Sequence, residues 1–161
     1  MSAFDFVLDE TQMLEAGEYA EWLELWDQDC VYWAPFTPEA VAPDDELNLI
    51  FDDHARLSDR VGRLLSGDAH AQDPPSVTSR LMGPIRSAVT TTAAGWSPAG
   101  AYDEAVTAHF ALTEIRRGQQ RQYAGTSTYW LRRDGASWRI AAKRVDLLQA
   151  RAALGNLTIL L

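Results

Sequence analysis

The chain has 161 residues, of which 47% are hydrophobic and 10% aromatic. This length supports one packed core, so we expect a single domain over residues 1–161, and a multidomain machine is excluded. The 14 basic and 23 acidic side chains give a net charge of −9. That charge repels phosphate backbones and anionic lipid surfaces, so we expect neither nucleic acid nor a membrane as a partner.

The charges are unevenly divided along the chain. Residues 1–59 contain 16 acidic residues and one basic residue, whereas residues 60–161 contain 7 acidic and 13 basic residues. The two parts are electrostatic complements. Their charges can be satisfied within one subunit, or between one copy and another copy or a different chain.

Cysteine and histidine are scarce: the chain has Cys30 and the separate histidines His54, His70 and His109. Iron–sulfur clusters and structural zinc sites need several such residues at short spacings, so we expect no metal site and no cofactor in this chain. Glycine-rich phosphate loops are also missing. With no internal disulfide, no secretory signal and no apolar stretch long enough to span a membrane, the chain is expected in the cytoplasm.

The first part of the chain mixes helical and strand patterns. Apolar residues at helical spacing predict helices over 4–16 and 18–26. A β-prone run predicts a strand over 30–35, and alternation over 47–51 predicts a second, short strand.

A third helix is predicted to follow. Asp52 or Asp53 can cap it, and its apolar stripe runs to 65–67 with His54 on the stripe.

Long strands dominate the rest of the sequence. Residues rich in Val, Thr, Ile, Tyr and Trp predict strands over 76–93, 101–117, 119–133 and 136–148. Asp134-Gly135 is a hairpin signal, and Gly83-Pro84 predicts a bulge. Helices first and antiparallel strands afterwards predict an α+β fold, a strongly curved, cone-shaped sheet with the N-terminal helices on one face. The apolar end of the chain, 157–161, must be covered.

Several short sequence motifs follow one another along the chain in a characteristic order. They are YAEWLEL at 19–25, YWAP at 32–35, PPSVTSR at 74–80, YWLR at 129–132, WRIAAKRVDL at 138–147 and the apolar end at 157–161. Together they resemble the small (beta) subunit of the aromatic-ring-hydroxylating dioxygenases, the Rieske non-haem iron oxygenases. The resemblance covers nearly the whole chain and implies the nuclear-transport-factor-2-like, or scytalone-dehydratase-like, cone.

This resemblance also implies a function. In that family the alpha subunit carries the Rieske [2Fe–2S] cluster and the mononuclear Fe(II), while the beta subunit is structural within a trimer of heterodimers. The chain is then expected to be non-catalytic, to form a homotrimer in an alpha3beta3 assembly, and to support an alpha subunit that dihydroxylates an aromatic compound. The ligand shortage described above agrees with this, because one cysteine cannot hold a Rieske cluster, and the spacing of the three separate histidines indicates no pair that could hold a mononuclear iron.

Two further functions remain open. One is a stand-alone dehydratase or isomerase in which His54 acts as a general base inside the cone, with Asp29, Tyr32 or Asp53 as its partner. The simpler interpretation is a buried or interfacial histidine held by a neighbour. The other function is binding of a hydrophobic ligand.

Aromatic and basic side chains supply candidate interface residues. Tryptophan is frequent in interfaces as well as in cores, and arginine suits pairing with carboxylates of another subunit. The alternative for the basic strands is a solvated edge that resists aggregation. The candidates are Trp22, Trp33, Arg60, Arg63, Arg80, Arg132 and Arg144.

Overall fold

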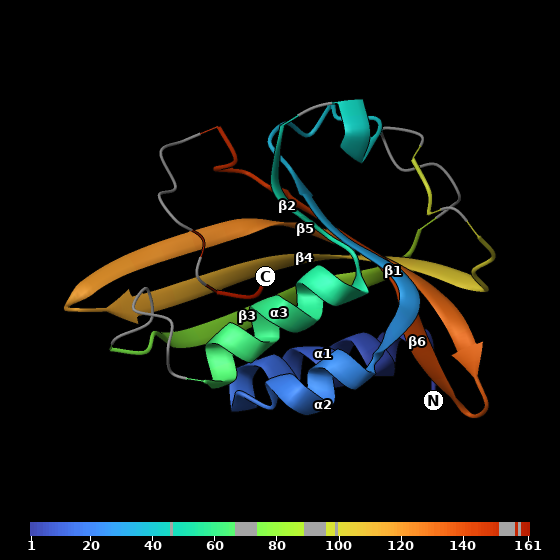
Figure 1. Cartoon of the computed structure of the whole chain (residues 1–161), viewed down its shortest axis with the longest axis horizontal. Coiled ribbons are helices and arrows are strands. Elements are labelled where there is room, and N and C mark those ends of the chain that lie inside the picture. Colours follow the sequence, from blue (N-terminus) through green and yellow to red (C-terminus); the bar gives the residue numbers. More distant parts are fainter. Residues whose placement is uncertain (46, 67–73, 89–95, 99, 152–156, 158) are drawn as a thin grey trace.

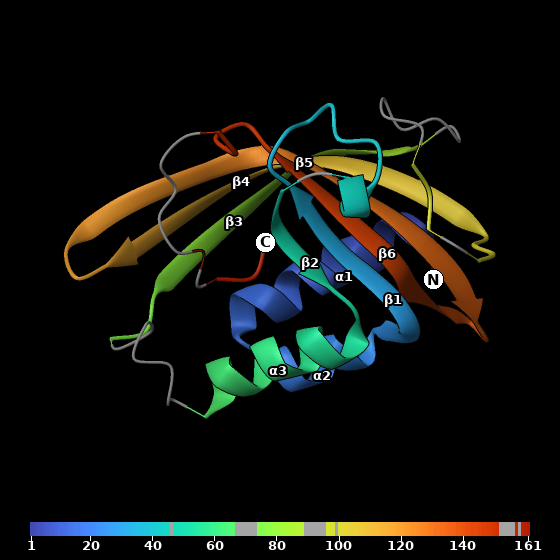
Figure 2. The same ribbon diagram turned by 45° about the horizontal axis from the view of Figure 1, so that its top comes forward.

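The structure is a computed structural model that describes residues 1–45, 47–66, 74–88, 96–98, 100–151, 157 and 159–161. Three helices lie together beneath a curved sheet (Figures 1 and 2). They are α1 (Ala3–Ala16), α2 (Tyr19–Glu24) and α3 (His54–Leu65). The sheet arches over them, so its inner face and the helices enclose the core.

The helices begin and end where the sequence supplies caps. The Ser2 side chain accepts a hydrogen bond from the Asp5 amide at the start of α1, and Gly17 ends that helix in the left-handed region with φ 74°. Asp53 rather than Asp52 caps α3, accepting from the Arg56 amide at 2.9 Å.

Six strands form one mixed sheet in the order β2-β1-β6-β5-β4-β3. All neighbours are antiparallel except β1 and β6, which are parallel. A short 3₁₀ turn, η1 (Pro43–Asp45), precedes β2. The strands are β1 (Trp26–Pro35), β2 (Asn48–Asp52), β3 (Val77–Ser87), β4 (Glu104–Arg116), β5 (Gln119–Asp134) and β6 (Ser137–Leu147).

Turns and a bulge set the course of the long strands. Arg117 and Gly118 join β4 to β5, both with positive φ (50° and 72°), which matches the twist of a tight hairpin. Gly135, at φ 58°, serves the β5–β6 hairpin, as the Asp134-Gly135 signal predicts. The β3–β4 register shifts between Met82 and Ile85, which confirms the predicted bulge at Gly83-Pro84.

The two faces of the sheet are both covered in part. Inward side chains such as Tyr123, Tyr129 and Leu131 alternate along β5 and pack on the helices. On the other face, Trp96 lies between Trp33 and Trp130 with ring centroids 4.9 and 5.1 Å away. Tryptophans therefore stabilise both sides of the sheet.

The predicted α+β class and curved sheet are confirmed, but two boundaries are wrong, namely the end of the second helix and the start of the first strand, which was expected at residue 30. The helix expected over 18–26 ends at Glu24, and Trp26 begins β1. The cause is long-range: the Ile140 amide donates to Leu25 O at 2.8 Å, and Trp26 pairs with Ile140 of β6. The predicted end of the third helix at Gly67 and the part of the first long strand beyond Ala88 lie outside the described residues.

Candidate functional site

A buried polar cluster lies inside the cone, centred on Glu10 of α1. Its carboxylate is 1% exposed and accepts hydrogen bonds from Trp22 Nε1 at 2.8 Å, Lys143 Nζ at 2.8 Å and Tyr129 Oη at 3.1 Å. These residues come from α1, α2, β5 and β6. The cluster therefore joins two helices and two strands of the sheet through one carboxylate.

Burial decides the electrostatics of this cluster. Removal from water lowers the pKa of Lys143, and the adjacent Glu10 carboxylate opposes that shift. Burial and the Glu10 charge together raise the pKa of Tyr129 well above its usual value. Because both Glu10 oxygens and the lysine are already paired, the arrangement is that of a structural ion pair and offers no unoccupied acid or base.

The sequence indicates that Glu10 and Lys143 are buried, but its periodicity does not show that they pair with each other. Glu10 occupies the same helical stripe as the buried Phe6, Val7 and Leu14. Lys143 lies on the inward face of β6 with Val145. A charge on an apolar stripe indicates a buried partner, but only the fold shows which one.

The apolar segment 159–161 also packs into the interior of the cone. Ile159, Leu160 and Leu161 are buried. Tyr32 Oη donates to Leu161 O at 3.1 Å and accepts from its amide at 2.9 Å. Arg80 donates to Leu160 O at 2.7 Å and pairs with Glu15 at 3.0 Å. The sequence predicted that this apolar segment must be covered, and the interior of the cone covers residues 159–161.

The four pocket candidates for a stand-alone enzyme are engaged with different partners. His54 Nε2 lies 3.3 Å from the Gln28 amide nitrogen, near the surface. Asp29 pairs with Arg132 at 3.1 Å, Asp53 caps α3, and Tyr32 holds the chain end. Burial raises the pKa of Tyr32 above its usual value. These contacts do not assemble a histidine–carboxylate pair.

Most of the seven interface candidates make contacts within the chain. Trp22 and Trp33 are fully buried, and the Arg144 guanidinium lies 4.5 Å above the Trp33 ring and pairs with Asp146 at 2.8 Å. Arg63 is exposed on α3. Their role at an interface stays a prediction.

Part of the uneven charge is used inside one subunit. Among the described residues, five basic residues of 60–161 form ion pairs with acidic residues of 1–59. The pairs are Arg60–Asp52 (2.6 Å), Arg80–Glu15 (3.0 Å), Arg132–Asp27 (2.7 Å), Lys143–Glu10 (2.8 Å) and Arg151–Glu39 (2.8 Å). The internal alternative therefore accounts for part of the charge pattern seen in the sequence.

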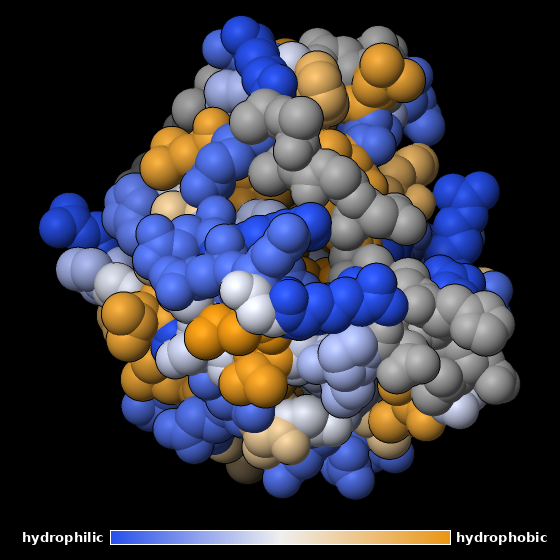
Figure 3. All heavy atoms as spheres, turned by 90° about the vertical axis from the view of Figure 1, so that its left-hand side faces the viewer, coloured by the Kyte–Doolittle hydropathy of each residue, from blue (hydrophilic) through white to orange (hydrophobic). Residues whose placement is uncertain are grey.

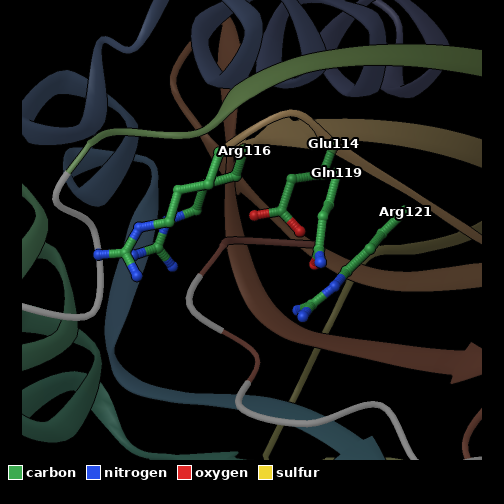
Figure 4. A pocket seen from close by; sticks show the side chains of 5 residues that line it. Glu114, Arg116, Gln119 and Arg121 are labelled. Carbon is green, nitrogen blue, oxygen red and sulfur yellow. The ribbon is translucent and has the colours of Figure 1, made fainter.

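A cationic pocket lies at the end of the β4–β5 hairpin (Figure 4), with a volume of about 170 Å³. The lining residues are Glu114, Arg116, Arg117, Gln119 and Arg121. Its single carboxylate is buried, because Glu114 accepts from Ser76 Oγ and, at 3.2 Å, from Tyr123 Oη. The three arginines lie within six positions of one another in the sequence, at the end of β4 and the start of β5.

The described part of the chain contains neither a metal-binding cluster nor a membrane-spanning helix. No three His, Cys, Asp or Glu residues in it are grouped so that they could hold a metal ion. None of its helices is long and apolar enough to cross a membrane.

Comparison with known proteins identifies the relatives of this fold. The sequence model of the family described as "Ring hydroxylating beta subunit" matches residues 9–152. The chain belongs to this family. The family predicted from the short sequence motifs is thereby confirmed.

The small oxygenase component of the p-cumate 2,3-dioxygenase system of Pseudomonas putida is 34% identical over 160 residues, covering 98% of this chain and 84% of that protein. Among solved structures, the beta subunit of benzoate 1,2-dioxygenase from Burkholderia mallei has a TM-score of 0.71 at 22% identity, covering 97% of this chain and 93% of that one. An NTF2-like protein from Novosphingobium aromaticivorans has a TM-score of 0.54 at 16% identity, covering 94% and 85%. The NTF2-like cone is also confirmed.

Proposed function

We propose that this beta subunit is the non-catalytic small component of a two-component oxygenase and works beside a larger alpha subunit that hydroxylates an aromatic compound. The observation that carries the proposal is the family match over residues 9–152. The chain is also similar over nearly its full length to a protein described as a small oxygenase component.

The residue inventory supports placing the iron centres on the alpha subunit. A Rieske cluster is held by two cysteines and two histidines, and this chain has one cysteine. That residue, Cys30, is buried, and burial raises the pKa of its thiol to about 12, which disfavours the thiolate that a metal requires. In this proposal the [2Fe–2S] cluster and the mononuclear Fe(II) both belong to the partner.

The contribution of this chain is then rigidity. The Glu10 cluster and the buried chain end fix the helices against the sheet, and the outer surfaces of a rigid cone can hold a partner in one orientation. The proposal includes a homotrimer of beta subunits within an alpha3beta3 assembly in the cytoplasm. It also places Arg63, which is exposed, at a subunit interface.

The proposal is tested by co-expression with a large oxygenase subunit that carries both iron centres. We expect the two chains to co-purify, with iron and aromatic hydroxylation present in the complex and absent from the isolated small chain. Iron bound tightly by the isolated chain, or turnover by it alone, would refute the proposal.

A matched pair of histidine variants tests the remaining alternative. His54→Ala removes the candidate base, and His109→Ala removes an exposed histidine that contacts Thr126 at 3.1 Å. We expect both variants to support the same turnover in the complex. Turnover by the isolated small chain that is lost in the His54 variant and kept in the His109 variant would favour the dehydratase or isomerase class instead.

A further inference from the structure

The pocket at the end of the β4–β5 hairpin continues the concave face of the sheet beyond the helices. Leu112 of β4 and Tyr123 of β5 belong to the core, and pocket residues continue from them at steps of two on the same face. Figure 1 shows the hairpin extending past the three helices. The inward face, which packs on helices elsewhere, forms here a concavity of about 170 Å³.

Positive charge predominates in this pocket. Three guanidinium groups and one carboxylate line it, which gives a formal charge of +2. Both oxygens of the carboxylate, on Glu114, already accept hydrogen bonds, one from Ser76 Oγ and one from Tyr123 Oη. Figure 3 views the molecule from the hairpin end and shows hydrophilic side chains gathered across its centre. An anion in the pocket therefore meets unbalanced positive charge.

The net charge of the whole chain, −9, does not cancel this local excess. Charges are screened over about 8 Å at physiological ionic strength, so the field in the pocket comes mainly from the residues that line it. The overall charge still repels a long polyanion, because such a molecule must lie against much of the surface. A small anion inside the pocket is instead attracted by the arginines.

Two of these arginines are placed to hold an anion between them. Arg116 lies opposite Gln119 and Arg121 opposite Glu114, so the two arginines are diagonal neighbours with Cβ atoms about 7–8 Å apart. Arg116 Nε donates to Pro74 O at 3.1 Å, which orients the guanidinium, and its terminal nitrogens offer further donors. Figure 4 shows Arg116 and Arg121 on opposite sides of Glu114 and Gln119.

Backbone geometry and electrostatics tie the other arginine charges to the same place. Arg117 has a φ of 50° at the hairpin turn, the one positive φ of a non-glycine residue in the part of the chain that the structure describes. Glycine or asparagine suits that conformation better than arginine. Burial and the Glu114 charge raise the pKa of Tyr123, and the nearby Arg121 guanidinium opposes that rise. Arg121 therefore acts on the pocket although it is exposed.

The volume and the donors of the pocket select the class of anion. A cavity of about 150 Å³ holds one benzene molecule, so this pocket admits a single oxyanion or its small ester, but no nucleotide. Guanidinium groups donate pairs of parallel hydrogen bonds to phosphate and carboxylate oxygens. A tetrahedral oxyanion presents oxygens to both arginines at once, and two negative charges match the formal charge of +2.

We propose that this pocket binds a doubly charged oxyanion of the phosphate class, either free phosphate or a small phosphate monoester, between Arg116 and Arg121. Arg117 adds positive charge, and the Gln119 amide can donate one further hydrogen bond. The inference goes beyond the proposed function and is independent of it, because binding of the anion needs no large subunit.

Calorimetric titration of the isolated full chain tests this assignment, at about pH 8 and a fixed ionic strength of about 0.05 M. The ligands are inorganic phosphate, phenyl phosphate and the singly charged benzoate. Arg116→Gln and Arg121→Gln each remove one guanidinium from the pocket, and Glu114→Gln removes its negative charge. Arg86→Gln is the matched control, because Arg86 is exposed near the other end of β3.

We expect phosphate to bind the unaltered chain with a dissociation constant of about 1 mM or lower. Arg116→Gln and Arg121→Gln should each weaken binding by about tenfold or more, and Arg86→Gln should leave it unchanged. Glu114→Gln should tighten binding by about fivefold, a gain that a misfolded variant cannot produce. Tighter binding of phenyl phosphate would assign the site to monoesters, and tighter binding of inorganic phosphate would assign it to the free ion.

Four results would overturn the inference. The first is no binding of either phosphate ligand by the unaltered chain at about 10 mM ligand. The second is unchanged affinity in both pocket arginine variants, which would place the anion elsewhere. The third is equal weakening in the Arg86 variant, which would indicate general attraction to basic surface. The fourth is benzoate binding as tight as phosphate binding, which would contradict a site for a doubly charged ligand.

Discussion

The buried Glu10–Lys143 pair gives the sharpest stability prediction. In Lys143→Met the carboxylate loses its cation while it stays buried and keeps the Trp22 and Tyr129 donors. Removing one partner of a buried ion pair costs about 3–5 kcal/mol. Because two donors remain on the carboxylate, we expect the lower end, about 3 kcal/mol.

A second substitution separates the charge from the lost packing. In Glu10→Gln/Lys143→Met, the amide oxygen can still accept from Trp22 and the amide nitrogen can donate to Tyr129 Oη, whose hydroxyl also accepts. We expect this double variant to recover about 2 kcal/mol of the loss, since no unpaired charge is left in the interior.

Urea unfolding followed by tryptophan fluorescence, at one fixed protein concentration, measures these differences. The control is Arg151→Met, whose pair with Glu39 is 63% and 70% exposed and should contribute less than about 1 kcal/mol. If Lys143→Met and Arg151→Met destabilise the protein equally, or if the Gln substitution recovers nothing, the interpretation of this cluster as a buried ion pair is wrong.

Three further predictions concern single positions. A Cβ on Gly125 would overlap the backbone of Asp146, whereas a Cβ on Gly62 would meet open space. In urea unfolding, Gly125→Ala should therefore lose at least about 3 kcal/mol of stability, and Gly62→Ala should gain about 0.5–1 kcal/mol. Equal effects of the two substitutions would contradict this. The Cys30 thiol titrates near pH 9 when unfolded and near 12 when folded, so the unfolded state binds fewer protons between these values and stability falls as pH rises, by up to about 1.4 kcal/mol per pH unit. Cys30→Ala should remove this contribution, so the fall in stability from pH 8 to 10 should become shallower than in the unaltered chain, below the pH at which the raised pKa values of Tyr32 and Tyr129 add to it. An equally steep fall in the variant would refute the assignment. Asp53→Ala removes the α3 cap and should cost about 1 kcal/mol in the same assay, and a neutral result would show that the cap is dispensable.

The sequence was most informative where local chemistry decides the structure. The long strands, the Asp134-Gly135 hairpin, the Gly83-Pro84 bulge and a helix cap at Asp52 or Asp53 follow from turn chemistry and from periodicity over a few residues. The order of the short sequence motifs was enough to indicate the family.

The sequence was weakest where residues far apart in the chain meet. Trp26 has a helical neighbourhood yet joins a strand, because pairing with Ile140 of β6 outweighs its local preference. His54 falls on an apolar stripe, as a buried base would, but it lies near the surface beside Gln28. In both cases the deciding contact lies outside the local pattern.

By itself the sequence determined the class of fold, the order of its elements, the family and the imbalance of charge between 1–59 and 60–161. Only the tertiary structure decided how that charge is used: Glu10 meets Lys143 across 133 positions inside the cone, while Arg151 meets Glu39 at the exposed surface. The physical reason is range. Local preferences act over a few neighbouring residues, whereas an ion pair forms between whichever charges the packed core brings within a few ångströms, and 14 bases and 23 acids allow many combinations.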